Sequence, residues 1–232
     1  NYKMPGHIGI IGCSYEGAAL CYRTICNEGS IYLGRHSHPE VTLHTHPLSE
    51  YMKFIEAGDW NGVADLMISS AHKLIKAGAR ILVCPDNTIH QSYSLVAGEV
   101  SVPFLHIAEE VAAEANKNYF RKTLLLGTKF LMEGPVYPEK LNAKHISYEV
   151  PEEDQRVQIN HIIFNELVYG VIKPESKKYF LDIIEERKLE GCDSVILGCT
   201  EIPLIVIPGE SQLPVLDSTR ILARAALKKA IE

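Results

Sequence analysis

Two ten-residue stretches, Gly78-Ala-Arg-Ile-Leu-Val-Cys-Pro-Asp-Asn87 and Gly191-Cys-Asp-Ser-Val-Ile-Leu-Gly-Cys-Thr200, align without gaps at an offset of 113 residues, from position 78 to position 191. In each stretch a glycine precedes a short aliphatic run, and a polar turn follows it. A short aliphatic run without polar alternation is typical of a strand buried on both faces of a parallel sheet. Because the offset is about half of the 232-residue chain, the repeat predicts two similar α/β lobes.

The rest of the chain alternates in the same way. Aliphatic runs at residues 8–11, 104–107, 123–126 and 215–216 predict further strands. Helical periodicity is found at residues 16–25, 48–56, 60–76, 88–97, 108–117, 152–169, 175–190 and 219–231. We therefore predict an α/β fold of two pseudo-symmetric lobes, each a mostly parallel sheet flanked by helices. The expected first lobe comprises residues 1–107 and 208–232, and the expected second lobe residues 108–207.

Composition excludes several classes of function. Lysine and arginine total 23 against 29 aspartates and glutamates, a net charge of −6, which argues against a nucleic-acid partner. No apolar run approaches the ~18–20 residues of a membrane helix, so no membrane partner is expected. The N-terminal residues lack a secretory-signal pattern. Six scattered cysteines without a C-x-x-C motif fit a reduced, cytoplasmic setting. We expect a soluble cytoplasmic protein.

The aligned turns carry ionisable side chains. The repeat pairs Asp86 with Cys199, each at the carboxyl end of its predicted strand, where ligands bind in open α/β sheets. Backbone N–H groups of a following helix would lower the pKa of a thiol there and favour a thiolate. Either turn alone could simply cap a helix. Two matched turns, each with an ionisable side chain, favour a catalytic function.

Four segments resemble motifs of the aspartate/glutamate racemase superfamily, and the resemblance covers nearly the whole chain. They are Gly198-Cys-Thr-Glu-Ile202, Asp86-Asn-Thr-Ile-His90, Gly12-Cys-Ser-Tyr-Glu16 and Leu126-Gly-Thr-Lys-Phe-Leu-Met-Glu133. The first resembles the family's second catalytic turn. The second resembles its first catalytic turn, which usually reads Cys-Asn-Thr-x-His.

This resemblance implies a PLP-independent isomerase, namely an amino-acid racemase without any cofactor. It also implies a homodimer, with the active site in the cleft between the two lobes. Family members use two cysteines, one removing the proton beside a carboxylate of a small acidic amino-acid substrate and the other returning one. The family's carboxylate-binding residues map to Ser14, Asn87, Thr88, Thr128, Thr200 and Glu201. His46 lies in the segment that corresponds to the family's substrate-covering loop, and it is a further candidate for substrate binding. Because Glu201 is itself an anion, it fits better as a contact for an amino group or as a residue orienting Cys199.

The departure from the family is Asp86, which replaces the first cysteine. Asp86 and Cys199 could form an asymmetric acid/base pair. Alternatively, Cys84 could be the first thiol with Asp86 as its partner, since both point to one face if the strand stays regular. In a third arrangement, Asp86 binds a cation or amino group, or caps a helix, while Cys199 alone carries the chemistry. We favour the first, because the repeat and the family motif independently place Asp86 at the paired position.

The presence of Asp86 also allows more than one class of substrate. An unperturbed aspartate has a pKa near 3.9, against about 8.5 for cysteine, and is therefore a weaker base. An isomerase, racemase or decarboxylase of another small carboxylate is one alternative, and a non-catalytic member that binds a small anion is another. The H-x-H pattern of His44 and His46 could bind zinc on a strand, but no third ligand lies at a close spacing. We predict no metal site.

Overall fold

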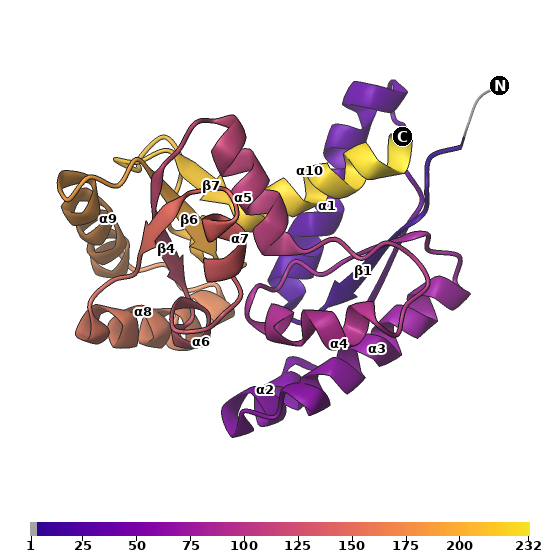
Figure 1. Ribbon diagram of the computed structural model, residues 1–232, viewed down its shortest axis with the longest axis horizontal. Coiled ribbons are helices and arrows are strands. Elements are labelled where there is room, and N and C mark those ends of the chain that lie inside the picture. Colours follow the sequence, from indigo (N-terminus) through magenta and orange to yellow (C-terminus); the bar gives the residue numbers. More distant parts are fainter. Residues whose placement is uncertain (1–3) are drawn as a thin grey trace. The chain divides into compact units, whose positions relative to one another are not determined.

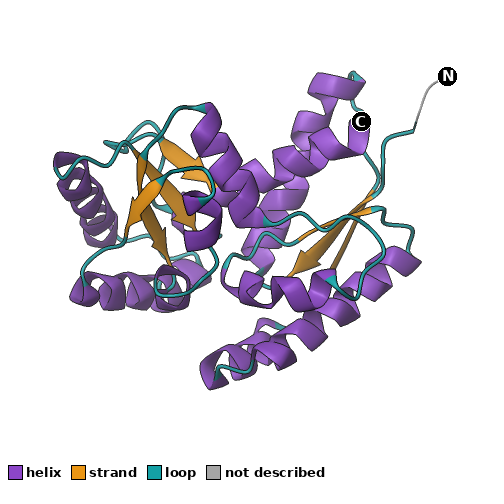
Figure 2. Cartoon of the chain, viewed as in Figure 1, coloured by secondary structure: helices purple, strands orange, loops and turns teal. Residues whose placement is uncertain are grey.

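The computed structural model describes residues 4–232, and the chain divides into two compact units (Figure 1). Unit 1 runs to Ile107 and resumes with Thr219–Glu232, whereas unit 2 is Ala108–Ser218. Each unit contains one parallel sheet with its own helices (Figure 2). The predicted fold class, α/β with parallel sheets flanked by helices, is confirmed.

Unit 1 is built around the sheet β2-β1-β3, in which all pairs are parallel. Beyond β3, Phe104 makes a single parallel bridge to Leu82. The elements of this unit are β1 (Ile8–Gly12), α1 (Tyr15–Leu33), β2 (Val41–Thr45), α2 (Leu48–Ala57), α3 (Trp60–Lys76), β3 (Ile81–Val83), η1 (Thr88–Ser92), α4 (Tyr93–Ala97) and α10 (Ser218–Ile231).

Unit 2 is built around the parallel sheet β5-β4-β6-β7. Its elements are α5 (Ile107–Lys117), β4 (Lys122–Gly127), α6 (Lys129–Met132), α7 (Pro138–Asn142), β5 (Ser147–Glu149), α8 (Glu153–Asn165), η2 (Leu167–Tyr169), α9 (Pro174–Leu189), β6 (Ser194–Gly198), η3 (Ile202–Leu204) and β7 (Val215–Asp217). Its strand order repeats that of unit 1, since β4 corresponds to β1, β5 to β2 and β6 to β3. The two aligned sequence stretches therefore contain equivalent strands, β3 and β6.

Each unit has its own hydrophobic core. Every residue of β1 and of β6 is buried, as expected for the middle strands of a covered parallel sheet. In unit 1, Ile8 and Ile10 of β1 pack with residues of α1 and with Leu222 and Ala226 of α10. In unit 2 the strands β4 and β6 pack with α8 and α9. Burial of the aliphatic runs thus explains why the sequence pattern predicts the sheets.

Four sequence-based expectations about the elements and their boundaries are wrong. Residues 208–218, expected in the first lobe, belong to unit 2 because β7 pairs with β6. Residues 104–107 do not form a strand: only Phe104 bridges, and α5 begins at Ile107. The expected helix 88–97 starts as a 3-10 turn, and the expected helix 152–169 is interrupted after Asn165. The short strands β2 and β5 and the short helices α6 and α7 were not predicted.

Glycines end the two central strands of unit 2. Gly127 and Gly198 are register partners at the carboxyl ends of β4 and β6. A Cβ added to Gly198 would lie 2.9 Å from the Leu126 carbonyl oxygen and would overlap the Leu131 side chain. The absence of a side chain there lets α6 lie directly over the strand ends, next to the turn that carries Cys199.

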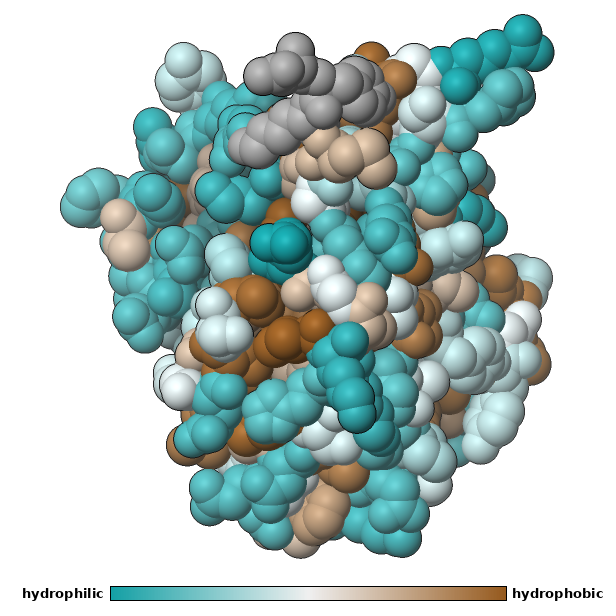
Figure 3. Space-filling view, turned by 90° about the vertical axis from the view of Figure 1, so that its right-hand side faces the viewer, coloured by the Kyte–Doolittle hydropathy of each residue, from teal (hydrophilic) through white to brown (hydrophobic). Residues whose placement is uncertain are grey.

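Hydrophilic residues cover most of the face shown in Figure 3, where hydrophobic residues form a group near the centre. This distribution agrees with the balanced composition, 46% hydrophobic and 22% charged residues. Within residues 4–232, none of the helices combines the length and the apolar character needed to cross a membrane.

Candidate active site

The expected site residues lie at the carboxyl edge of their own sheets. In unit 1, Ser14 follows β1, His46 follows β2, and Asp86 follows β3. In unit 2, Thr128 follows β4, and Cys199 follows β6. This is the edge at which parallel α/β sheets bind ligands. The repeat therefore places Asp86 and Cys199 at equivalent points of two separate units.

The Asp86 carboxylate is held by the backbone of the loop that follows β1. The Cys13 N–H donates to Oδ2 at 3.2 Å, and the Ser14 N–H lies 3.2 Å from both carboxylate oxygens. Hydrogen bonds donated to a carboxylate stabilise its charged form. Asp86 is therefore an anchored carboxylate, and it is only partly buried.

Cys84 points into the core of unit 1. Its side chain is fully buried, and Sγ donates to the Asp86 carbonyl oxygen at 3.8 Å. Burial, and then the negative charge of Asp86, raise the pKa of the Cys84 thiol well above its ordinary value. Because β3 ends at Val83, regular strand alternation does not extend to Cys84 and Asp86. These features favour a neutral packing role for Cys84.

His90 ties the Asp86 turn to the start of α5. Its Nε2 accepts from the Ile107 N–H at 3.2 Å, so Nδ1 carries the proton and donates to the Asp86 carbonyl oxygen at 2.8 Å. Burial, and then the neighbouring His106, lower the pKa of His90 to about 3. A buried neutral imidazole with both nitrogens engaged makes His90 a packing residue that supports the Asp86 turn.

Tyr51 of α2 is a neighbour of Asp86 that sequence analysis missed. It is fully buried, and its hydroxyl has no hydrogen-bond partner among the described residues, although Ser70 is close. Burial is the main cause that raises the pKa of the Tyr51 hydroxyl, and the nearby Cys84, Cys13 and Asp86 add to it. In the sequence it is one apolar position of an amphipathic helix, and nothing there distinguishes it.

His44 and His46 both face α3, as the H-x-H spacing on a strand predicts. Their rings are 5.0 Å apart, His44 Nδ1 lies 2.8 Å from the Ser70 hydroxyl, and His46 Nε2 lies 3.1 Å from the Ser69 hydroxyl. Burial, and then the positive charge of Lys73, lower the pKa of both histidines. They are therefore neutral hydrogen-bonding groups near neutral pH.

Cys199 in unit 2 is a buried thiol beside a buried carboxylate. Cys199 is 6% exposed and Glu201 is 5% exposed, and Cys199 Sγ donates to Glu201 Oε2 at 3.0 Å. Burial, and then the charge of Glu201, raise the pKa of the Cys199 thiol well above its ordinary value. The expectation of a thiolate favoured by a helix N-terminus is wrong for this structure. Only the three-residue turn η3 follows Cys199, and burial together with the Glu201 carboxylate outweighs its effect on the pKa of the thiol.

Neutral donors surround both turns. Asn87, Thr128 and Thr200 are buried, while Thr88 is partly exposed. Thr128 also caps α6, because its hydroxyl oxygen accepts from the Leu131 N–H at 3.2 Å. Hydroxyl and amide groups of this kind can bind carboxylates without adding charge.

Comparisons with known proteins agree with this chemistry. The sequence pattern of the family described as Asp/Glu/Hydantoin racemase matches residues 8–226. A candidate Asp/Glu racemase from Yersinia pestis is 32% identical, with a TM-score of 0.89, covering 98% of this chain and 100% of that chain. An aspartate racemase homologue from Pyrococcus horikoshii OT3 is 33% identical, with a TM-score of 0.84, covering 97% and 99% of the two chains. The broad specificity amino-acid racemase RacX of Bacillus subtilis (strain 168) is 26% identical over 73% of each chain.

Two repeated α/β units with acid/base side chains at equivalent strand ends define a racemase-type isomerase. The chain belongs to the Asp/Glu/hydantoin racemase family. The predicted relationship to the aspartate/glutamate racemase superfamily and the predicted enzyme class are therefore confirmed.

Proposed function

We propose that this protein racemises a free amino acid, without a cofactor, by proton transfer at the α-carbon. The observation that carries the proposal is the different surroundings of the two repeated turns. The Asp86 carboxylate accepts from two backbone N–H groups, whereas the Cys199 thiol donates to the Glu201 carboxylate. One turn thus offers a proton acceptor and the other a proton donor. Aspartate and glutamate are the first substrates to test, because the family and the Pyrococcus homologue carry those names.

In the proposed mechanism, the Asp86 carboxylate takes the α-proton from one face of the substrate. The Cys199 thiol gives a proton to the opposite face, which inverts the configuration. Ser14, Asn87, Thr88, Thr128 and Thr200 hold the carboxylates and stabilise the enolate-like charge that develops. His46 is the proposed contact from the loop after β2. The mechanism requires both turns to reach one α-carbon.

The buried Cys84 supports the asymmetric pair over a two-thiol arrangement. A thiolate at this position would be fully desolvated and close to the Asp86 charge. Asp86, in contrast, is partly exposed, and its carboxylate accepts hydrogen bonds from the Cys13 and Ser14 N–H groups. We therefore propose Asp86 as the base of unit 1, with Cys84 as its packing neighbour.

Asp86 itself favours a second candidate function. A carboxylate is a weaker base than a thiolate, so it suits a substrate with a more acidic proton. An isomerase, racemase or decarboxylase of another small carboxylate fits that chemistry. Incubation in D₂O with aspartate, glutamate, neutral and basic amino acids, and related dicarboxylates separates the candidates by which compound exchanges its proton.

The decisive variant is Cys199→Ala. We expect it to abolish both inversion and α-proton exchange with solvent, because the thiol that serves unit 2 is lost. Deuterium incorporation followed by mass spectrometry, with chiral chromatography of the same samples, measures both. Cys192→Ala is the matched control, since it removes another buried thiol of unit 2 that lies at the opposite end of β6. Undiminished exchange by Cys199→Ala would overturn the assignment.

The same experiment with Asp86→Asn examines the other turn. Asparagine keeps the shape but cannot accept the α-proton. Loss of inversion supports Asp86 as the base, whereas unchanged inversion would support the arrangement in which Cys199 alone carries the chemistry.

We also propose that the protein is a cytoplasmic homodimer. The six scattered cysteines, without a C-x-x-C motif, support a reducing compartment, and the family resemblance supports the dimer. Light scattering coupled to size-exclusion chromatography would show a mass of twice 25.9 kDa if the dimer forms.

A further inference from the structure

Cys199 and Glu201 form a buried hydrogen bond in unit 2. Both side chains are more than nine-tenths buried, and the thiol donates to Glu201 Oε2 at 3.0 Å. Sulfur hydrogen bonds are ordinarily longer and weaker than those between oxygen and nitrogen. A buried thiol at this distance from a buried carboxylate is therefore held in one orientation.

Two sets of groups act on the sulfur in opposite directions. The backbone N–H groups of Glu201 and Ile202 point to it and favour a thiolate, which lowers the pKa of Cys199. Burial and the Glu201 carboxylate favour the thiol, and together they outweigh the backbone. The carboxylate side chain is the component that a single substitution can remove without changing the backbone donors.

We propose that Glu201 is a positioning residue that keeps Cys199 aimed and protonated, so that the resting enzyme presents an acid at this turn. This inference rests on the proposed racemase function. For the enantiomer whose α-proton faces Asp86, it assigns the order of events: the proton leaves the substrate toward Asp86 before Cys199 supplies one. Glu201 would accordingly govern the protonation state of the thiol and would not hold the substrate.

Every proton in the proposed catalytic cycle has a source and an acceptor. Asp86 gains the α-proton as the C–H bond breaks and the electron pair stays on the substrate. The carbanion then takes the proton of the Cys199 thiol, which leaves a thiolate 3.0 Å from a carboxylate. Repulsion between these two anions favours prompt reprotonation of the thiolate from solvent. Asp86 returns its proton to solvent.

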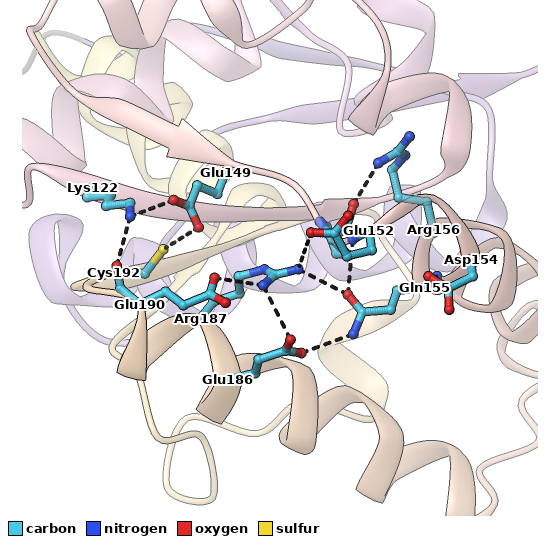
Figure 4. Close-up of polar contacts among 11 residues, drawn as sticks. Lys122, Glu149, Glu152, Asp154, Gln155, Arg156, Glu186, Arg187, Glu190 and Cys192 are labelled. Atoms are coloured by element: carbon cyan, nitrogen blue, oxygen red, sulfur yellow. Dashed lines mark hydrogen bonds and ion pairs between the residues drawn. The ribbon is translucent and has the colours of Figure 1, made fainter.

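The chain offers an internal comparison in the same unit. Cys192 Sγ lies 3.9 Å from Glu149 Oε2, and Glu149 is also paired with Lys122, as Figure 4 shows. Burial, and then Glu149, raise the pKa of Cys192 to about 11. This second thiol–carboxylate pair is longer and is shared with a lysine, and it lies at the opposite end of the sheet from the Cys199 turn.

The test measures thiol reactivity without substrate. Iodoacetamide alkylation of each cysteine is followed by peptide mass spectrometry between pH 6 and pH 10. We expect Glu201→Gln to move the Cys199 alkylation midpoint down by at least about one pH unit, a tenfold rise in thiolate at a given pH. The alkaline limb of the racemisation profile should fall by the same amount, because the thiol needed as acid is lost at lower pH.

Two further variants keep the result interpretable. Glu149→Gln should change the alkylation midpoint of Cys192 and leave the alkylation midpoint of Cys199 unchanged. Glu201→Asp retains the charge, so it should leave the Cys199 midpoint closer to the wild-type value than Glu201→Gln does, whereas loosened packing would accelerate alkylation in both. Equal Cys199 midpoints in the wild type and Glu201→Gln would overturn the inference. Because alkylation needs no racemase activity, that failure is distinct from failure of the proposed function.

Discussion

Asp86 and His90 show how single residues hold the first turn in place. The Asp86 side chain accepts from backbone N–H groups of the loop after β1, and the main-chain carbonyl oxygen of Asp86 accepts from His90. His90 in turn accepts from the Ile107 N–H. A carboxylate fixed at both its side chain and its main chain loses little further freedom when a substrate binds. This rigidity is what positioning a proton acceptor requires.

His90 makes the stability of unit 1 depend on pH. Its folded pKa of about 3 lies below the ordinary value of 6.5, so the unfolded chain takes up a proton that the folded chain does not. The contribution of neutral His90 to the free energy of unfolding is therefore fully present above pH 6.5 and is lost as the pH falls toward 3. We expect the wild type to lose about 2 kcal/mol more than His90→Asn between pH 7 and pH 5. Urea unfolding at both pH values measures this, and parallel losses would contradict it.

At the level of elements, the joint between α2 and α3 is made by two residues. Gly58 ends α2 with a left-handed backbone, at φ +66°, which glycine adopts without strain. Asp59 then begins α3, and its Oδ1 accepts from the Gly62 N–H at 2.9 Å. This joint sets the direction of α3, whose residues Ser69 and Ser70 hydrogen-bond His46 and His44.

Asp59→Ala should lower the free energy of unfolding by about 1 kcal/mol, because α3 loses its N-terminal cap. Asp59→Asn keeps an acceptor oxygen and should retain most of the stability. Guanidinium unfolding of the two variants provides the comparison. If Asp59→Asn were as destabilised as Asp59→Ala, the charge of Asp59 and not its hydrogen bond would be the stabilising feature.

At the level of the whole molecule, the chain passes from unit 2 back to unit 1 within a few residues. Strand β7 ends at Asp217 in unit 2, and α10 begins at Ser218 and packs into the core of unit 1. Arg224 of α10 also makes two hydrogen bonds to Glu28 of α1, at 2.8 and 2.9 Å. The last helix, α10, is therefore part of the core of unit 1, the unit that contains Asp86.

Leu222→Ala should destabilise unit 1 selectively. Leu222 is fully buried with Ile8 and Ile10, and such truncations cost about 2–5 kcal/mol. Hydrogen exchange followed by mass spectrometry should show lost protection in β1 and α1, with β4 and β6 changed less. Ile183→Ala, in the core of unit 2, should give the reverse pattern. Equal loss in both units would show that they unfold together.

Much of the fold could be predicted from local pattern. Buried strands such as β3 and β6 are uniformly aliphatic and follow a glycine, so they stand out in the sequence. Strand β5 is three residues long and only partly buried, and it has no such pattern. Residues 215–217 do form a strand, but assigning it to a unit requires its pairing with β6. Pairing depends on contacts between distant segments, which periodicity does not encode.

The sequence by itself determined the α/β class, the family and the two turns that carry Asp86 and Cys199, because strand pattern and motif are local properties. Only the tertiary structure decided the state of those groups. Backbone N–H groups more than seventy positions away hold the Asp86 carboxylate. Burial and the Glu201 carboxylate keep Cys199 a thiol, although its place after a strand suggested a thiolate. Protonation depends on desolvation and on charges through space, and both exist only once the chain has folded.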